Sequence, residues 1–381
     1  MRPAWLVAAL PLLTVSGCRS REIETTPATS RITPPRPPAR DAGALAIGML
    51  VPTTGPRRSL GDEAQTAAAM ALEEANAAEG EPRLVLSVRP DDGQWGAQAR
   101  EASALIYEDG CVALVAALDG AATHVVEQVA TKAQVPVVTP WASEDTVTQA
   151  GVPWVFRCVP SDRQQAQALL SAAWAHGPPA VHFEATCDGR KADGALQRAA
   201  KQAGKTLALR AEIPESPPEQ DALAKQVAQS GAGAVVVLGG SEGLAAMLPA
   251  LRSQAPETEV FASLGACTPQ LLATAGETLA AVRVPWPAEA DSGELEDFSR
   301  RYRQRQGARP SPLAAFTYDT VSLVAEAIRQ AGPSRAELQQ FLTTVDRSGV
   351  TGPIRFDQAG NRLCDLTVMP AAELLGASSA E

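Results

Sequence analysis

From residue 44 onward, the chain alternates short apolar runs, rich in β-branched residues, with longer amphipathic segments. This order is typical of strand–helix–strand units, in which crossover helices join parallel strands. Most of the runs are continuously apolar, as expected of strands that are covered on both faces of a sheet. Strands are predicted at residues 45–51, 84–88, 112–116, 135–138 and 155–158.

A second series of the same kind follows. Its strands are predicted at residues 181–184, 207–212, 234–238, 260–263 and 281–284, with helices at 192–203 and 242–254 between them. A helix of the first series is predicted at 59–78. In the first helix, Ala64, Ala68 and Leu72 recur on one face at helical spacing. Ser59 and Asp62 stand in a weak capping-box relation, so Ser59 is predicted to cap this helix. We therefore expect an α/β fold of two Rossmann-like lobes, each a parallel sheet flanked by helices.

Three proline-containing segments separate these series, and proline favours extended backbone in the residue before it. They are Val159-Pro160-Ser161, Pro285-Trp286-Pro287 and Gly332-Pro333-Ser334. We interpret them as three connectors of a hinge between the lobes. The predicted boundaries are 44–158 with 287–332 for lobe 1, 159–286 with 333–370 for lobe 2, and 371–381 for a disordered tail.

The N-terminus has the features of an export signal. Residues 4–15 form an apolar run after Arg2, which is shorter than the roughly 20 residues that span a bilayer. Residues 15–18, VSGC, resemble the bacterial lipobox, in which Cys18 would carry lipid; the alternative is an ordinary signal peptide with a chance cysteine. Residues 1–18 are predicted as the signal peptide and the proline-rich residues 19–43 as a tether. We expect a membrane-anchored chain on the periplasmic side, and Arg19 favours the outer membrane.

The charge balance excludes one class of partner. The net charge is −10 and the isoelectric point is about 5.0. The sequence therefore has no basic footprint for nucleic acid.

Five segments, in order, resemble a known family. They are IGMLVPTTGP with LGDEAQTAAAMALEEANA, VPVVTPWAS, VFRCVPSDRQQA, AAFTYDTVSLVAEAIRQAG and GVTGPIRFDQAGNR. They are similar to the type I periplasmic binding proteins of the leucine/isoleucine/valine-binding group, which serve ABC importers. The resemblance covers residues 44 to 370 and implies two lobes that close on a small polar ligand, a permease partner and no catalysis.

Signals for enzyme chemistry are incomplete. Residues 239–243, GGSEG, match the G-x-S-x-G pattern of a nucleophile elbow. In hydrolases with that elbow the histidine follows the serine, whereas His124, His176 and His182 all precede Ser241. No C-x-x-C or H-x-x-x-H spacing predicts a metal site, and no G-x-G-x-x-G follows the first strand, so no cofactor is predicted.

Five cysteines follow Cys18 in a compartment that permits disulfides. Cys111 and Cys158 lie on different strands of one predicted sheet, too far apart to bond. Cys187 and Cys267 both follow carboxyl ends of second-lobe strands and are the more plausible pair.

The ligand of an open α/β sheet lies outside the carboxyl ends of the strands. The resemblance implies that Ser143 holds the ligand, because it matches a family position where a Ser or Thr hydroxyl binds an amino acid. Asp119 and Gly120 replace a usual Ser-Ser pair, and Asp119 is alternatively a helix cap. Arg57 either meets an anionic ligand or faces water, and Trp141 is either a stacking wall or a loop anchor.

Three more candidates depart from the family pattern. Leu60 stands where an aromatic is common, and Asp188 and Ser241 stand where tyrosines are preferred. Asp188, like Asp119, could answer a ligand's positive charge or cap a helix. The Gly265-Ala266 loop lacks the acidic residue that would pair with an ammonium group. A pocket without its donors and acceptors loses affinity, so binding of a branched-chain amino acid is not predicted.

Two functions follow from this sequence. The first is a lipid-anchored solute-binding protein that closes on a small polar, amino-acid-like or related ligand for an ABC importer. The alternative is a lipoprotein of the same fold that acts through protein contacts, such as a peptidoglycan-synthase activator, for which the long tether is suited.

Overall fold

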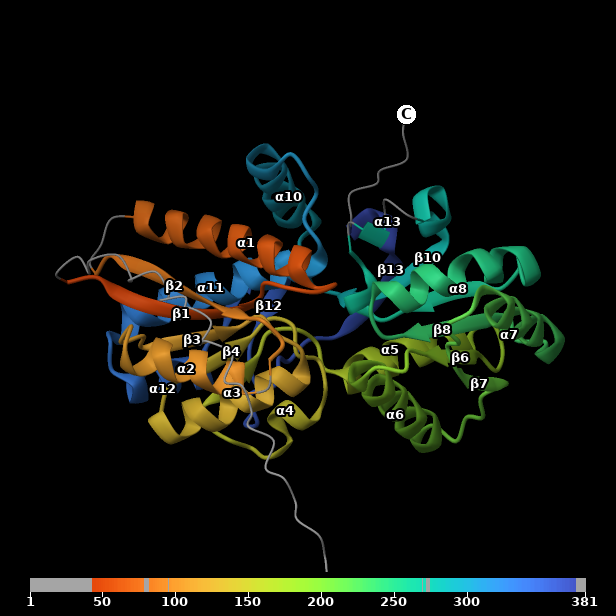
Figure 1. Cartoon of the computed structure of the whole chain (residues 1–381), viewed down its shortest axis with the longest axis horizontal. Helices are drawn as coiled ribbons and strands as arrows, with labels where there is room; N and C mark the ends of the chain where they lie inside the picture. The colour runs from red at the N-terminus through yellow and green to blue at the C-terminus, as the bar shows by residue number, and fades with distance from the viewer. Residues whose placement is uncertain (1–42, 79–81, 95, 269, 272–274, 375–381) are drawn as a thin grey trace, which may run out of the picture. The chain divides into compact units, whose positions relative to one another are not determined.

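The folded part of the chain contains two sheets built from the predicted strands (Figure 1). The computed structural model describes residues 43–78, 82–94, 96–268, 270–271 and 275–374. The first sheet is five-stranded and parallel, in the order β2-β1-β3-β4-β5. Its strands are β1 (Leu45–Pro52), β2 (Leu84–Asp91), β3 (Ala113–Ala116), β4 (Val137–Thr139) and β5 (Val155–Arg157).

The second sheet is six-stranded, in the order β13-β10-β9-β8-β6-β7. Its strands are β6 (Ala180–Phe183), β7 (Leu209–Glu212), β8 (Ala234–Leu238), β9 (Glu259–Ala262), β10 (Val282–Pro287) and β13 (Leu366–Pro370). All neighbours are parallel except β13, which pairs antiparallel with β10. The prediction of an α/β fold with two parallel sheets is confirmed, while the antiparallel edge strand β13 was not predicted.

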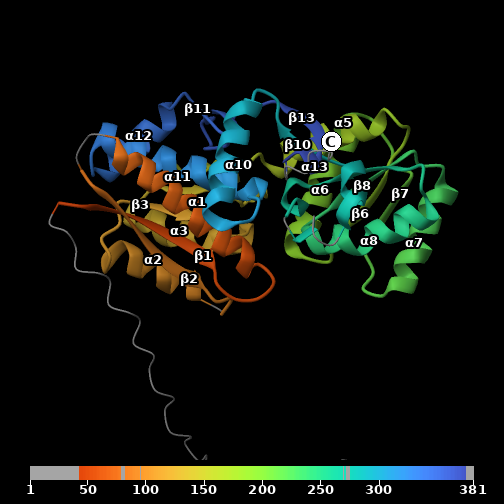
Figure 2. The same ribbon diagram turned by 90° about the horizontal axis from the view of Figure 1, so that it is seen from above.

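Helices cover both faces of the first sheet (Figures 1 and 2). One core joins the sheet to α1, α11 and α12, and the other joins it to α2 and α3. The helices of this region are α1 (Arg58–Ala77), α2 (Ala97–Tyr107), α3 (Gly120–Ala133), α4 (Thr146–Gln149), α11 (Pro312–Ala331) and α12 (Arg335–Thr344). After α12, the chain forms a hairpin of β11 (Arg347–Gly349) and β12 (Gly352–Ile354).

The second sheet is covered by α5 and α6 on one face, and by α7 and α8 on the other. Its helices are α5 (Asp162–Trp174), α6 (Cys187–Gln202), α7 (Pro217–Ser230), α8 (Ser241–Gln254) and α13 (Ala371–Leu374), with 3-10 turns at Leu264–Ala266 and Gly276–Ala281. The helix α10 (Ser292–Gln306) packs Phe298 and Tyr302 into the same core as α8.

The passages between the sheets differ in part from the prediction. Residues 159–161 do join β5 of the first sheet to α5 of the second, where Ser161 and Gln164 form a capping box. Residues 285–287 are extended, but they form the end of β10. Residues 332–334 join α11 to α12, and both helices pack on the first sheet.

The segment 333–370 is therefore divided between the sheets. Leu338 and Leu342 of α12 share a core with Ile47 and Met49, whereas β13 belongs to the second sheet. The passage lies between Phe356, which packs in the first core, and β13. The boundary predicted at residue 333 is therefore not the point of passage. Residues 332–334 were predicted to be a hinge connector, but a proline segment also suits a turn between two helices that pack on one face of a sheet.

Two local predictions are wrong. Helix α1 begins at Arg58 with Arg57 at its N-cap, and the Ser59 hydroxyl accepts a hydrogen bond from Gln270 Nε2 at 2.7 Å instead of capping the helix. Cys187 and Cys267 are both free thiols. Cys267 is buried in the second core while Cys187 is exposed at the start of α6, so the two side chains occupy different environments.

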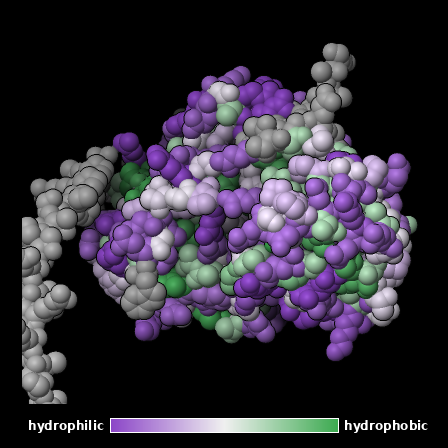
Figure 3. Space-filling model, turned by 45° about the vertical axis from the view of Figure 1, so that its right-hand side comes forward, coloured by the Kyte–Doolittle hydropathy of each residue, from purple (hydrophilic) through white to green (hydrophobic). Residues whose placement is uncertain are grey.

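The surface is largely hydrophilic. On the face in Figure 3, hydrophilic residues predominate and hydrophobic ones occur in small groups. The exposed large hydrophobic side chains of the described residues are Val88, Tyr107 and Leu363. Within the described part of the chain, the helices are too short or too polar to cross a bilayer. Cys18, the predicted tether and the tail from residue 375 lie outside the described residues.

Candidate functional site

Polar side chains follow the carboxyl ends of several strands in both sheets. Asp119 follows β3, Ser143 follows β4, Asp188 follows β6 and Ser241 follows β8. The first three of these residues lie near one another. Ser143 and Asp188 both influence the Asp162 carboxyl, and the charge of Asp119 influences Asp188. This is the edge at which open α/β sheets bind ligands.

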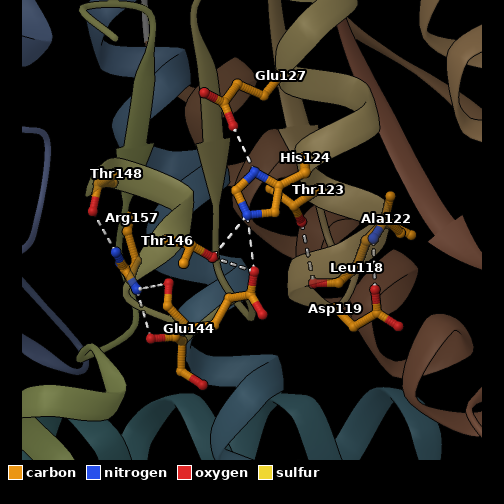
Figure 4. Close-up of polar contacts among 11 residues, drawn as sticks. Leu118, Asp119, Ala122, Thr123, His124, Glu127, Glu144, Thr146, Thr148 and Arg157 are labelled. Carbon is orange, nitrogen blue, oxygen red and sulfur yellow. Dashed lines mark hydrogen bonds and ion pairs between the residues drawn. The ribbon is translucent and has the colours of Figure 1, made fainter. Parts of the chain in front are cut away.

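Helix α3 begins at this edge with an acidic cap (Figure 4). Asp119 Oδ1 accepts a hydrogen bond from the Ala122 backbone N–H at 2.8 Å. Its other oxygen forms an ion pair with Arg57, whose side chain is half exposed. Gly120 is buried, and a Cβ at this position would lie 2.4 Å from Glu144 Cδ. The predicted residues Arg57, Asp119 and Gly120 therefore lie together, and Asp119 does cap its helix.

A buried arginine fixes the backbone of the loop after β4. Arg157 is fully buried and donates to the carbonyl oxygens of Ser143 at 2.6 Å and Glu144 at 2.7 Å. It also donates to Thr148 and Asn361 (Figure 4 shows the contacts to the loop and Thr148). Burial lowers the pKa of Arg157 to about 10, against the opposing effect of nearby carboxylates. The guanidinium thus fixes the backbone that presents Ser143.

Ser143 connects this loop to the second sheet. Its carbonyl accepts a hydrogen bond from the Asp162 backbone N–H at 2.7 Å, and its side chain hydrogen-bonds the Asp162 carboxyl. Burial raises the pKa of that carboxyl to about 7, although the bond from Ser143 acts in the opposite direction. Ser143 is therefore placed at the junction between the loop after β4 and the start of α5.

A histidine between two carboxylates contacts Glu144, the residue after Ser143 (Figure 4). His124 Nδ1 is 3.0 Å from Glu127 Oε2, and its Nε2 is 2.8 Å from Glu144 Oε1. Thr146 donates a hydrogen bond to the same Glu144 oxygen at 2.6 Å. The imidazole thus links α3 to the loop after β4.

The second sheet contributes two more carboxylates. Asp188 lies in the first turn of α6, and Glu184 Oε1 accepts from the Gly243 backbone N–H of α8 at 2.6 Å. Part of the Asp188 surface is open to water, but neighbouring protein atoms displace water from around its carboxyl. This desolvation, and next the negative charge of Asp119, raise the Asp188 pKa to about 6. Glu144 and Glu184 act in the same direction and Arg57 opposes them.

Three predicted residues are placed differently. Trp141 donates from its indole Nε1 to Thr317 Oγ1 at 3.1 Å and to the Leu313 carbonyl at 3.3 Å, so it anchors its loop to α11. Leu60 is half-buried in α1, and Ser241 is the half-buried first residue of α8. The structure records no contact that joins Leu60 or Ser241 to Asp119 or Ser143.

Two surface cavities lie elsewhere. One of about 550 Å³ is lined by residues of α10, α11 and β11, including Asp297, Tyr318 and Arg347. The other, of about 560 Å³, lies along α6 and includes Arg198 and Lys201. Neither is lined by a predicted site residue.

Comparison with known proteins places this geometry in a family. A family model described as a periplasmic binding protein matches residues 44–369. The chain belongs to the periplasmic binding protein family. This membership accounts for the two sheets, and it implies a location outside the cytoplasm.

Named relatives of this periplasmic binding protein bind small molecules. An amino acid binding protein of Pseudomonas aeruginosa is 25% identical over 328 residues, which cover 83% of this chain and 87% of that one. The fold is similar to a branched-chain amino acid transporter substrate binding protein of Streptococcus pneumoniae in complex with isoleucine, with a TM-score of 0.74, 21% identity, and coverage of 86% and 95%. It is also similar to a solute binding protein of an ABC transporter from Rhodopseudomonas palustris in complex with 3,4-dihydroxybenzoic acid, with a TM-score of 0.75, 18% identity, and coverage of 86% and 93%.

Sequence reasoning missed several residues at the site of this periplasmic binding protein. Glu144 directly follows Ser143, and Asp162 directly follows a predicted connector, so their positions in the chain could have identified them. Glu184 is the last residue of the strand predicted at 181–184, and no motif marks it. No local pattern singles out His124, because its partner Glu144 is distant in the sequence.

Proposed function

We propose that this chain is a lipid-anchored solute-binding protein that closes on a small polar ligand and presents it to an ABC permease. The observation that carries the proposal is the approach of Asp188, which follows β6, to Asp119 and Arg57, which follow β3 and β1. Charged groups that follow strands of both sheets are thus within electrostatic range of one another. A ligand bound there would bridge the two sheets.

The connections between the sheets support closure. The chain passes between them near residues 158–161, after β10, and between Phe356 and β13. Several passages of this kind permit hinge motion while keeping the two parts together. We propose Ser143 as a ligand-binding residue, with Arg57, Asp119, Gly120 and Asp188 beside it; Leu60, Trp141 and Ser241 are less directly supported.

The named relatives are binding proteins; one belongs to a branched-chain amino acid transporter and another to an ABC transporter. This supports a permease as the partner and a binding role without catalysis. No observation in the described residues favours the alternative of a peptidoglycan-synthase activator.

Ligand binding is tested with the purified full chain. Mass spectrometry identifies small molecules that copurify, and a thermal-shift screen of amino acids, amides, amines and aromatic acids identifies those that stabilise the fold. A ligand at 100 times its dissociation constant adds about 2.7 kcal/mol of stability. Ser143→Ala should weaken binding, whereas Ser103→Ala on α2 serves as a matched control. A screen in which nothing stabilises the chain contradicts the proposal.

Anchoring is tested separately. Cys18 lies outside the described residues, and lipid on its side chain and amino terminus would hold the chain at a membrane. Cys18→Ser should move the protein from the membrane fraction to the soluble fraction and abolish incorporation of a labelled fatty acid. Unchanged fractionation would show that Cys18 is not the anchor.

A further inference from the structure

Three helices begin at the candidate site, and each already carries a carboxylate of the chain itself. Asp119 accepts from the Ala122 N–H at the start of α3, and Glu184 accepts from the Gly243 N–H at the start of α8. Asp188 lies in the first turn of α6, where Thr186 Oγ1 accepts from the Gly189 N–H at 3.1 Å. The free N–H groups of a helix start attract anions, and here side chains of the protein have taken that role.

Glu144 adds an independent observation. It is only 4% exposed, and although its Oε1 contacts His124, its Oε2 has no hydrogen-bond partner among the described residues. That oxygen points at the start of α3, because a Cβ on Gly120 would lie 2.8 Å from it. A buried carboxylate oxygen without a donor is costly, and a positive charge nearby reduces that cost.

Two basic side chains at the candidate site already have acidic partners among the described residues. Arg57 pairs with Asp119, and His124 lies between Glu127 and Glu144. Asp119, Glu144 and Glu184 lie within electrostatic range of Asp188, and the positive charge of Arg57 opposes them. A ligand that brought its own carboxylate to these helix starts would meet repulsion.

We propose that the ligand is an organic cation, an amine or a guanidinium compound without a carboxylate, whose positive group lies between Asp119 and Asp188. The inference rests on the proposed binding function and specifies the class of its ligand. The charge of Glu144, whose carboxylate lies against Gly120, adds to the attraction for the cation.

The start of helix α1 differs from the three helix starts above, because no side chain caps it. A zwitterion could still place its carboxylate there. Leucine and benzoate, whose carboxylates would need such a place, are therefore the competing ligands.

The experiment compares linear compounds of five or six carbons that carry different charges. Binding of 1,5-diaminopentane, lysine and glutarate to the purified full chain is measured by isothermal titration, with leucine and benzoate as further probes. We expect diaminopentane to bind at least 100-fold more tightly than glutarate or leucine. Its affinity should fall as salt is raised, because the site charges are partly exposed.

Two variants locate the cation. Asp119→Asn and Asp188→Asn should each weaken diaminopentane binding at least tenfold, and asparagine can still cap α3. Asp221→Asn, on the exposed face of α7, is the matched control and should leave the affinity unchanged. Circular dichroism verifies that all three variants are folded.

The outcomes separate this inference from the proposed function. If leucine, lysine, glutarate or benzoate binds more tightly than diaminopentane, the solute-binding function stands and the cationic class is wrong. If both asparagine variants bind diaminopentane like the unaltered chain, the proposed position is wrong. If no compound in this set or in the wider screen binds, both proposals fail.

Discussion

Asp162 is a residue at the site whose charge depends on pH near neutrality. It is buried at the start of α5 and contacts Ser143, and burial raises its pKa from 3.8 to about 7. In the unfolded chain the carboxyl titrates near its ordinary value. The folded state therefore binds a proton more tightly than the unfolded state between these two pKa values.

The sign of the effect follows by linkage. The contribution of Asp162 to stability is fully present below the unfolded pKa and is lost as pH rises through about 7. Asp162→Asn, which mimics the protonated acid, should remove this contribution to the pH dependence and be more stable than the unaltered chain at pH 8. Urea unfolding at pH 5 and pH 8 measures both proteins. Equal pH dependence of the two would contradict the assigned pKa.

Helix α3 depends on the absence of a side chain at its first residue. A methyl group on Gly120 would lie 2.4 Å from Glu144 Cγ, so Gly120→Ala must displace Glu144 and with it the contact to His124. Overpacking of this kind costs about 1–3 kcal/mol. Gly194→Ala, in the middle of α6, meets only Arg198 Nη1 at 3.4 Å and should be neutral or stabilising by up to about 1 kcal/mol. Urea unfolding compares the two, and equal stabilities would show that Glu144 moves away without cost.

At the scale of elements, the predicted strands were accurate because β-branched apolar runs specify strands that are buried on both faces. The strands β1, β8 and β9 begin or end within one residue of prediction. The short edge strand β13 was missed, because LTVMP is only five residues long and its pairing with β10 is a tertiary contact. Ser143 was identified from its motif, whereas the Glu127–His124–Glu144 contacts required the spatial approach of α3 to a distant loop.

Two helices, α11 and α1, each contribute side chains to both hydrophobic cores. In α11, Ala314 and Phe316 pack with the second sheet, whereas Val324 and Ile328 pack with the first. Helix α1 is shared in the same way, since Met70 lies in the second core and Ala68 in the first. Loosening either core therefore disturbs helices on which the other depends.

We expect the two sheets to unfold together, in one calorimetric transition whose van't Hoff and calorimetric enthalpies agree. Phe316 is fully buried, with its ring centroid 5.4 Å from that of Trp286, so Phe316→Ala should cost about 3–5 kcal/mol and lower the single transition as a whole. Phe341→Ala on α12, where the ring is only partly buried against the first core, is the matched control and should cost less. Two separate peaks, of which Phe316→Ala moves only one, would show that the shared helices do not couple the sheets and that each lobe is stable independently.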